Sequence, residues 1–482
     1  AEVCGDSLDN NCNGVVDDAE PSECNTCTPS TGSCTTGVGG CARTGSLVCG
    51  NGGAVSVMSG EVSSCAVMNG GRVRCWGYNG NYNLGDTSTT NRIVPVDTFN
   101  PALSGVSQLI GGYQHQCALV SGQVRCWGLN NYGQLGNNTT ATGTTPQIAQ
   151  TTTGANLAGV VQVATGYYHT CALRNDGTVW CWGYNGNGEL GDDTTSTRYR
   201  AAVVPNLFDV VSLATGFHHT CAVRRNGTVW CWGYNFYGQV GDGLGGTGAQ
   251  SLRPVMVPGF NGAVEVVAGG YHTCVRVGGG GVRCWGRGDY GQLGQNSTST
   301  VYSPQTVLIN SSTALTGAVQ LSANYLQTCA RMGDGTVRCW GWNGYGQLGD
   351  GTTTNRSVAT PATALPQGAS TPVTLSDVRH IDVGHYTTCA ALTDLTVRCW
   401  GRGDYGQIGD GALLSRPRAT EVIELSGGTR CNAVPGNPAT ETCTADNNCN
   451  GLVGDVAQSL CNTCAPPTAT CSVGAGTCLR TG

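Results

Sequence analysis

Lysine is absent from the sequence, and charged residues together make up only 11% of its 482 residues. The net charge is −6 and the arginines are scattered, so the chain lacks the basic stripe that nucleic-acid binding requires. It has no run of about 18 apolar residues, which a membrane span would need. A signal peptide, a nucleophile elbow, a P-loop and a dinucleotide fingerprint are also missing. We therefore expect no enzyme, no nucleic-acid partner and no membrane span.

Glycine and cysteine are abundant instead, with 76 and 28 residues. Glycine together with many Thr, Ser and Asn residues is typical of short strands joined by tight turns. An even number of cysteines at regular spacing indicates disulfides that form in an oxidising compartment. We therefore predict an extracellular or cell-surface protein.

The tripeptide Cys-Trp-Gly occurs seven times, at intervals of 50 to 60 residues. Each copy follows a second cysteine by ten residues, or by nine in the second copy. The seven pairs are Cys65 and Cys75, Cys117 and Cys126, Cys171 and Cys181, Cys221 and Cys231, Cys274 and Cys284, Cys329 and Cys339, and Cys389 and Cys399. A repeat of this length, carried through the middle of the chain, indicates a repeat architecture.

The third copy shows how each repeat is built. Strands are expected at 160–164, 169–173, 178–182 and 201–204, separated by Gly- and Asn-rich turns. Four strands in about 50 residues are the signature of a propeller blade. The predicted fold class is therefore all-β, a seven-bladed β-propeller of four-stranded blades over residues 49–431. A solenoid is the weaker alternative, because radial closure hides sheet edges.

The repeated residues resemble the regulator of chromosome condensation family of propellers. The matching pieces are His-Thr-Cys-Ala-Leu at 169–173, Asp-Gly-Thr-Val, Cys-Trp-Gly at 339–341, and Tyr-Gly-Gln-Leu-Gly-Asp-Gly at 345–351. The cysteine pairs set this chain apart from the family's intracellular members and fit its exported bacterial members. The resemblance implies the fold, but not chromatin binding or nucleotide exchange. By analogy with a relative that inhibits β-lactamases, it also implies a protein-binding face.

Turn length sets the register of each cysteine pair. In the third copy, counting outwards from the turn at 175–177 places Cys171 opposite Cys181. In the second copy the turn is one residue shorter, and Cys117 still falls opposite Cys126. We therefore predict one cross-strand disulfide within each blade, rather than a redox-active site.

Alternation along the strands predicts which face of the sheet each aromatic or histidine side chain occupies. Trp182 is expected to pack against the neighbouring blade, with carbohydrate stacking as the alternative. Six histidines fall in the repeated Gly-x-x-His region: His115, His169, His218, His219, His272 and His385. We expect them to bond to backbone at strand starts; the alternative is a ring that binds a metal.

Small disulfide-rich, loop-rich modules are predicted at residues 1–48 and 432–482. The first carries a calcium-type loop, whose predicted ligands are Asp9, Asn11, Asn13, the Val15 carbonyl, Asp17 and Glu20. A turn stapled by disulfides, without metal, is the alternative. The second loop keeps Asp446, Asn448 and Asn450 but lacks the later acids, so it is expected to bind calcium weakly or not at all. Both loops resemble a metal-binding motif of bacterial surface proteins.

Two cysteines, Cys49 and Cys431, have no counterpart when the end modules are aligned. They flank the predicted propeller, so a disulfide between them would staple the seam between the first and last blades. The alternative pairs Cys49 with Cys41 and Cys431 with Cys443. Because both modules end Cys-x-Arg-Thr-Gly, we expect the native object to continue beyond Gly482, as another propeller or as the next subunit of a filament.

The module–propeller–module plan and the Thr-, Ser- and Asn-rich loops favour an extracellular structural or adhesive protein, one unit of a surface array or head-to-tail fibre. The alternative is a ligand-binding propeller, such as a secreted enzyme inhibitor or a lectin. The expected partners are copies of the chain itself, another extracellular protein or a glycan, and the expected cofactor is calcium.

Overall fold

The computed structural model of the chain describes residues 53–99, 103–366 and 369–425, together with the backbone of four short strands outside them. These strands are β1 (Ser33–Thr36), β2 (Arg43–Ser46), β33 (Thr470–Cys471) and β34 (Cys478–Leu479), paired antiparallel as β1 with β2 and β33 with β34. Both predicted calcium loops lie outside the described residues, as do Cys49 and Cys431. The predictions made for them stay predictions.

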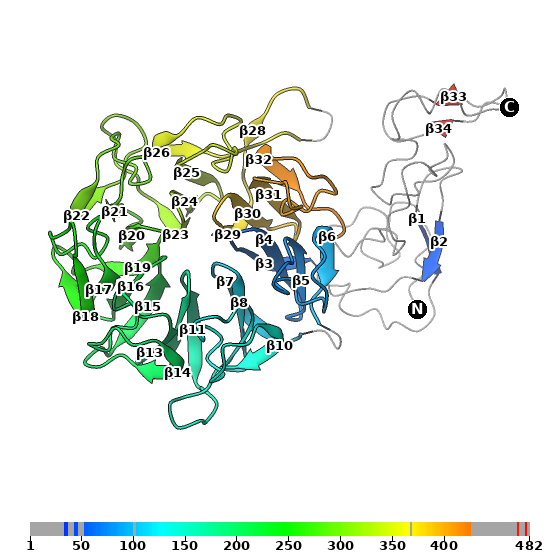
Figure 1. Ribbon diagram of the computed structural model, residues 1–482. Helices are drawn as coiled ribbons and strands as arrows, with labels where there is room; N and C mark the ends of the chain where they lie inside the picture. Colours follow the sequence, from blue (N-terminus) through cyan, green and yellow to red (C-terminus); the bar gives the residue numbers. More distant parts are fainter. Residues whose placement is uncertain are drawn as a thin grey trace. The chain divides into compact units, whose positions relative to one another are not determined.

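Residues Gly53–Leu425 form one compact unit, a ring of seven sheets that each contain four antiparallel strands (Figure 1). Each sheet is built from consecutive strands of one stretch of chain, so no strand is exchanged between blades, which we number 1 to 7 in chain order. The prediction of an all-β, seven-bladed propeller of four-stranded blades is confirmed. The first strand of each blade lies innermost, at the central channel.

The strands of blades 1 to 3 are β3 (Ala54–Ser59), β4 (Ser63–Met68), β5 (Val73–Gly77), β6 (Arg92–Asp97), β7 (Val106–Gly111), β8 (His115–Val120), β9 (Gln123–Gly128), β10 (Gly143–Ile148), β11 (Val160–Thr165), β12 (His169–Arg174), β13 (Val179–Gly183) and β14 (Arg198–Val203). Blades 4 and 5 contain β15 (Val210–Thr215), β16 (His219–Arg224), β17 (Val229–Tyr234), β18 (Gln250–Val257), β19 (Ala263–Ala268), β20 (His272–Val277), β21 (Val282–Gly286) and β22 (Val301–Thr306). Blades 6 and 7 contain β23 (Ala318–Asn324), β24 (Gln327–Met332), β25 (Val337–Gly341), β26 (Arg356–Pro361), β29 (Val378–Val383), β30 (Thr387–Leu392), β31 (Val397–Gly401) and β32 (Arg416–Glu421).

Blade 7 carries an extension that the repeat pattern did not predict. The connection from blade 6 forms β27 (Thr363–Ala364) and β28 (Val373–Thr374), and β27 joins the outer strand β32 in parallel through Ala364 and Ala419. The sequence signal was the interval of 60 residues before the last Cys-Trp-Gly, the longest of the series. The extension covers the outer edge of this blade, which would otherwise present unpaired backbone groups.

Every innermost strand has a bulge after its first residue. In β11, Val160 pairs with Arg174 and Gln162 pairs with Leu173, so Val161 is skipped and lies 54% exposed. A bulge turns the following side chain in a new direction. The Gln162 amide therefore reaches blade 4, where it donates to the carbonyl of Leu213 (2.9 Å) and accepts from its N–H (3.0 Å).

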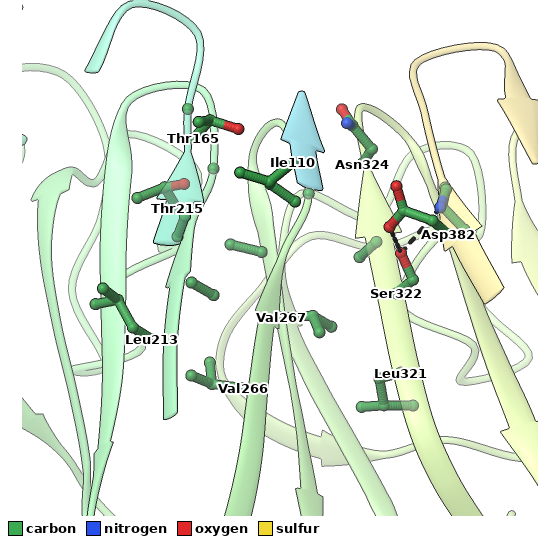
Figure 2. Close-up of a pocket in the computed structure, with 18 of the residues that line it drawn as sticks. Ile110, Thr165, Leu213, Thr215, Val266, Val267, Leu321, Ser322, Asn324 and Asp382 are labelled. Carbon is green, nitrogen blue, oxygen red and sulfur yellow. Dashed lines mark hydrogen bonds between the residues drawn. The ribbon is translucent and has the colours of Figure 1, made fainter. Parts of the chain in front are cut away.

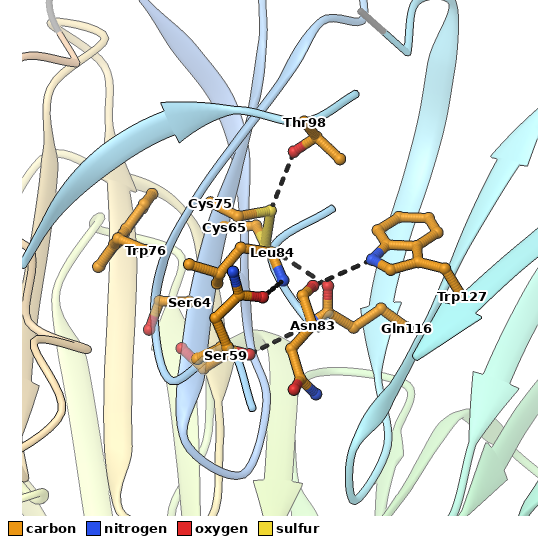
Figure 3. The surroundings of a disulfide bond; sticks show 12 residues. Ser59, Ser64, Cys65, Cys75, Trp76, Asn83, Leu84, Thr98, Gln116 and Trp127 are labelled. Carbon is orange, nitrogen blue, oxygen red and sulfur yellow. Dashed lines mark hydrogen bonds between the residues drawn. A yellow bond between two sulfur atoms is a disulfide. The ribbon is translucent and has the colours of Figure 1, made fainter. Parts of the chain in front are cut away.

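The seven predicted disulfides lie within the blades, each joining the second and third strands. Cys171 lies directly opposite Cys181, with the Cα atoms 4.1 Å apart, and Cys117 lies opposite Cys126 despite the shorter turn. Figure 3 shows the disulfide of blade 1, where the Thr98 hydroxyl donates to a sulfur atom at 3.3 Å. The register argument from the sequence is therefore confirmed.

Each tryptophan of Cys-Trp-Gly is fully buried against the preceding blade. Trp182 of blade 3 packs in one cluster with Cys117, Cys126 and Leu135 of blade 2. The same pairing of one blade's disulfide with the next blade's tryptophan occurs at all seven junctions, including the junction between blades 7 and 1. The predicted packing role of these tryptophans is confirmed, and buried rings of this size supply much of the stability of each junction.

Two of these tryptophans provide a test of one hydrogen bond. The Trp182 indole donates to the backbone oxygen of Gln134 at 2.8 Å, whereas the indole N–H of Trp340 has no partner among the described residues. We expect Trp182→Phe to lower the free energy of unfolding by about 1–3 kcal/mol more than Trp340→Phe, because only the first loses a hydrogen bond. Urea unfolding of the two variants measures the difference; equal losses would show that the indole bond contributes nothing.

Candidate functional site

Polar side chains at the start of the second strands join neighbouring blades. The histidine Nε2 atom of blades 2 to 5 bonds to a threonine hydroxyl of the next blade: His115 with Thr170 (3.0 Å), His169 with Thr220 (3.0 Å), His219 with Thr273 (2.9 Å) and His272 with Thr328 (2.8 Å). The Thr170 hydroxyl donates in turn to the backbone oxygen of Gln134 (2.9 Å). It must therefore accept from His115, which places the imidazole proton on Nε2.

Burial lowers the pKa of His115, His219 and His272 to about 3 and that of His169 to about 4, so these rings are neutral. The prediction that they bond to backbone is wrong: their Nε2 partner is a threonine hydroxyl of the next blade. The chain brings no group of three or more His, Cys, Asp or Glu side chains together for a metal within the part that the structure describes. In that same part, no helix has the length and apolar character to cross a membrane.

The seam between blades 7 and 1 has the same tryptophan and hydroxyl contacts and one additional carboxylate. Trp76 and the Ser64 hydroxyl both donate to the backbone oxygen of Gln407, each at 2.9 Å. Asp382 accepts from the Ser59 N–H at 2.7 Å and from the Ser322 hydroxyl at 3.0 Å. Burial raises the pKa of Asp382 to about 7, although the hydrogen bonds that it accepts act to lower the pKa. The described seam is thus closed without a covalent bond.

A cavity of about 450 Å³ occupies the central channel between the innermost strands (Figure 2). Its wall includes the side chains of Thr165 and Thr215 and the carboxylate of Asp382. The hydroxyls of Thr165 and Thr215 are buried and have no hydrogen-bond partner among the described residues.

One end of the propeller carries nearly all the tyrosines. Because the strands are antiparallel, the loops after the first and third strands of every blade emerge at the same end. These loops and the residues beside them hold all but two of the 17 tyrosines, the exceptions being Tyr199 and Tyr302. We call this end the aromatic face. Most of its rings contact another aromatic ring, and Tyr132, Phe236 and Tyr345 are more than a third exposed.

Two arginines sit within this face, each between three tyrosine rings. The Arg402 guanidinium lies 5.2 to 5.3 Å from the centroids of Tyr345, Tyr386 and Tyr405 and donates to Asp404 at 2.7 Å. Arg287 is held in the same way in blade 5, where it donates to Asp289 at 2.8 Å. Each arginine is thereby fixed by its rings and neutralised by its carboxylate.

A ring of side chains lies at the centre of the aromatic face. It comes from the loops after the innermost strands: Glu61, Tyr113, Tyr167, Phe217, Tyr325 and His385. Tyr113 stacks on Tyr167 with centroids 4.0 Å apart, and His385 lies 4.7 Å from Tyr325. Burial lowers the pKa of His385 to about 3 and raises the pKa of Glu61 to about 7. Glu61 is therefore the acidic member of an otherwise uncharged ring.

These features define a closed propeller of repeated blades, in which one set of contacts recurs at each junction. The chain matches the RCC1-like domain over residues 32–366 and the regulator of chromosome condensation (RCC1) repeat over residues 378–407. The chain belongs to the RCC1-like domain family, as its repeats predicted.

Curated relatives share the propeller at modest identity. The ultraviolet-B receptor UVR8 of Arabidopsis thaliana is 28% identical over 384 residues, which are 77% of this chain and 71% of the receptor. The human E3 ubiquitin-protein ligase HERC2 is 29% identical over 399 residues, which are 80% of this chain but only 7% of the ligase. The match to HERC2 therefore concerns a small part of that protein.

Solved structures of similar proteins have the same fold as this chain. Human WBSCR16 aligns with a TM-score of 0.61 at 22% identity, covering 73% of this chain and 94% of that one. Yeast RCC1 (Prp20), in its complex with Kap60, aligns with a TM-score of 0.57 at 22% identity, covering 72% of this chain and 81% of that one.

Sequence reasoning identified the blade framework and missed the aromatic face. The signal was present: tyrosines follow the strand-ending glycines and precede Gly-Gln-Leu-Gly, so they recur at loop positions rather than in strands. Glu61 and Asp382 had no such signal, since neither belongs to the repeated pattern. Of the predicted histidines, His218 and His385 lie on the aromatic face rather than at the junction positions, and His218 approaches the Glu189 carboxylate at 3.1 Å.

Proposed function

We propose that this chain is a non-enzymatic binding protein of an oxidising, extracellular or cell-surface compartment, and that its aromatic face binds a protein partner. The observation that carries the proposal is the composition of this face. Tyrosine, tryptophan and arginine are the residues that contribute most to protein interfaces, and tyrosine with Gly and Asn is typical of antibody binding loops. The aromatic face combines these residues at one end of the propeller.

Rigidity of the supporting blades favours the same proposal. Binding costs less free energy when the surface is already ordered. Here the face is anchored by strands with internal disulfides, and the Arg402 and Arg287 side chains are fixed between tyrosine rings. Such a surface offers preorganised aromatic contacts and two guanidinium groups at fixed places.

Two structures of one relative, yeast Prp20, concern protein binding. One is of Kap60 bound to yeast RCC1 (Prp20), and another reports binding of Prp20p to Gsp1p and histones. They support a protein partner here by analogy, without identifying it. The structural or adhesive role, head-to-tail assembly and calcium binding predicted from the sequence stay proposals that rest on the sequence alone.

The test uses a photo-crosslinking phenylalanine analogue, p-benzoylphenylalanine, at two matched exposed positions. Phe236 is 36% exposed on the aromatic face, and Phe208, 53% exposed, lies in a blade-to-blade loop at the opposite end. In the native host, we expect a discrete protein adduct at position 236 and none at 208. With the partner purified, Phe236→Ala combined with Tyr345→Ala should weaken binding by about tenfold or more, and Phe208→Ala should not. Equal adducts at both positions, or unchanged binding by the double variant, would overturn the proposal.

A further inference from the structure

The central ring of the aromatic face contains a carboxylate that is largely buried and incompletely paired. The Glu61 side chain is only 15% exposed. Its nearest described polar neighbours are the Gln114 amide, which donates at 3.4 Å, and His385, whose Nδ1 is 3.8 Å away. The Gln114 bond is long and His385 is neutral, so neither compensates a full negative charge.

Within the described part of the chain, no cationic side chain pairs with this carboxylate. The sequence has no lysine, and among the described residues no arginine lies within ion-pair distance of Glu61. Arg402 acts on Glu61 through its charge, but its guanidinium is hydrogen-bonded to Asp404 at 2.7 Å and surrounded by three tyrosines. The Arg402–Asp404 pair is neutral as a whole, which leaves Glu61 as an uncompensated charge at this point of the face.

Aromatic rings lie around His385, whose Nδ1 is 3.8 Å from the same carboxylate. The charge of Glu61 acts on the hydroxyls of Tyr167, Tyr168 and Tyr386, all half-buried in the ring or beside it. Tyr113 stacks on Tyr167, and Tyr386 stacks on His385 with centroids 5.3 Å apart. Ring faces attract cations through their quadrupole, and the attraction grows where water is excluded.

We infer that Glu61, with the rings of Tyr113 and Tyr167, forms a binding site for an organic cation of the ammonium type. The carboxylate neutralises the cation while the rings contact its alkyl groups, a combination that a neutral ligand cannot match. The inference rests on the proposed function and extends it to the partner's chemistry. The cation comes either from a lysine side chain of a protein partner or from a free quaternary amine.

The test measures binding of small probes to the full oxidised chain by nuclear magnetic resonance titration. The probes are choline, Nα-acetyl-lysine methylamide and 3,3-dimethylbutan-1-ol, the uncharged isostere of choline. At pH 8 we expect at least one cation to bind and the isostere not to bind. Binding of choline alone identifies a quaternary amine as the ligand, and binding of the lysine analogue alone identifies a partner's lysine.

Variants separate this site from nonspecific binding. Glu61→Gln keeps the shape of the side chain and should weaken cation binding by about tenfold or more. Tyr167→Leu keeps the carboxylate and removes one ring, and should weaken binding to a smaller extent. Asp334→Asn, in a turn at the opposite end of blade 6, should change nothing. Binding should also weaken from pH 8 to pH 6 as Glu61 takes up a proton; the groups that face it are Gln114, His385, Arg402, Tyr167, Tyr168 and Tyr386.

Two results would overturn the inference: equal binding of choline and its isostere, or no binding of either cation at pH 8. Neither result touches the proposed function, which depends on the Phe236 and Tyr345 contacts. Conversely, the chain can bind a cation at Glu61 while its aromatic face captures no protein. That result would support the cation site and contradict the proposed protein-binding function.

Discussion

Acidification from pH 7.5 to pH 5 is expected to destabilise the propeller by several kcal/mol. Burial lowers the pKa of six histidines to about 3 or 4: His115, His169, His219, His272, His380 and His385. In the unfolded chain each takes up a proton near pH 6.5. A group with a lowered folded pKa stabilises the native state above its unfolded pKa, and that stability is lost as the pH falls towards the folded pKa.

Two carboxyl groups act in the opposite direction. Burial raises the pKa of Asp382 and Glu61 to about 7, so the stability they contribute is present below their unfolded pKa and is lost as the pH rises through 7. Between about pH 5 and 6, unfolding therefore takes up six protons at histidine and releases two at these carboxyls. A net uptake of four protons corresponds to about 5 kcal/mol for each pH unit. The histidines contribute more than the two carboxyl groups, so acidification lowers the free energy of unfolding.

Urea unfolding across this pH range measures the loss of stability. The sequence of blade 6 suggests a matched control variant. In blade 6, Gln327 occupies the histidine position and its Nε2 donates to the Thr388 hydroxyl at 3.3 Å. His169→Gln should therefore keep the junction hydrogen bond and reduce the pH dependence by about 1.4 kcal/mol per pH unit. An unchanged slope in this variant, or a wild-type stability that does not fall below pH 6, would contradict the argument.

Reduction of the seven disulfides is expected to abolish folding. Each closes a loop of about ten residues, worth about 2–3 kcal/mol in the chain-entropy model. Seven such bonds total roughly 15–20 kcal/mol, which is more than the net stability of a typical domain. The sulfur atoms are also fully buried against the next blade's tryptophan, so the chain should resist reduction until it is unfolded.

The experiment unfolds the chain in urea with reductant and then removes the urea. Refolding should fail while the reductant remains, whereas the oxidised chain treated in parallel should regain its circular dichroism spectrum. Replacing one pair, Cys171→Ala with Cys181→Ala, should cost about 2–3 kcal/mol and leave a folded propeller. A reduced chain that refolds to its original stability would show that packing alone holds the blades.

Prediction from the sequence succeeded where the repeat itself carries the information. The alternation at 160–164 and 169–173 and the fixed cysteine spacing gave strands β11 and β12 and the pairing of Cys171 with Cys181. Each of these depends on neighbours within one blade. The prediction of four strands for blade 7 omitted only β27 and β28, which arise in an insertion.

Contacts between blades could not be derived in the same way. The bulge that directs Gln162 towards Leu213 depends on the register of two strands, and the Thr170 partner of His115 lies 55 residues away. Glu61 occupies a position that is aromatic in most other blades, and its high pKa follows from burial that only the closed ring creates. Such features follow from closure of the ring rather than from local pattern.

Closure of the ring by the same tryptophan–disulfide packing has one more consequence. Trp76 packs on the Cys389–Cys399 disulfide as Trp182 packs on the disulfide of blade 2, so the junction between the last and first blades is built like the other six. Each blade interacts with its two neighbours, and this holds for the first and last blades as well. The propeller is therefore a cyclic chain of units that share one packing motif. Circular permutation that cuts a different blade-to-blade loop and joins Gly53 to Leu425 would preserve every junction.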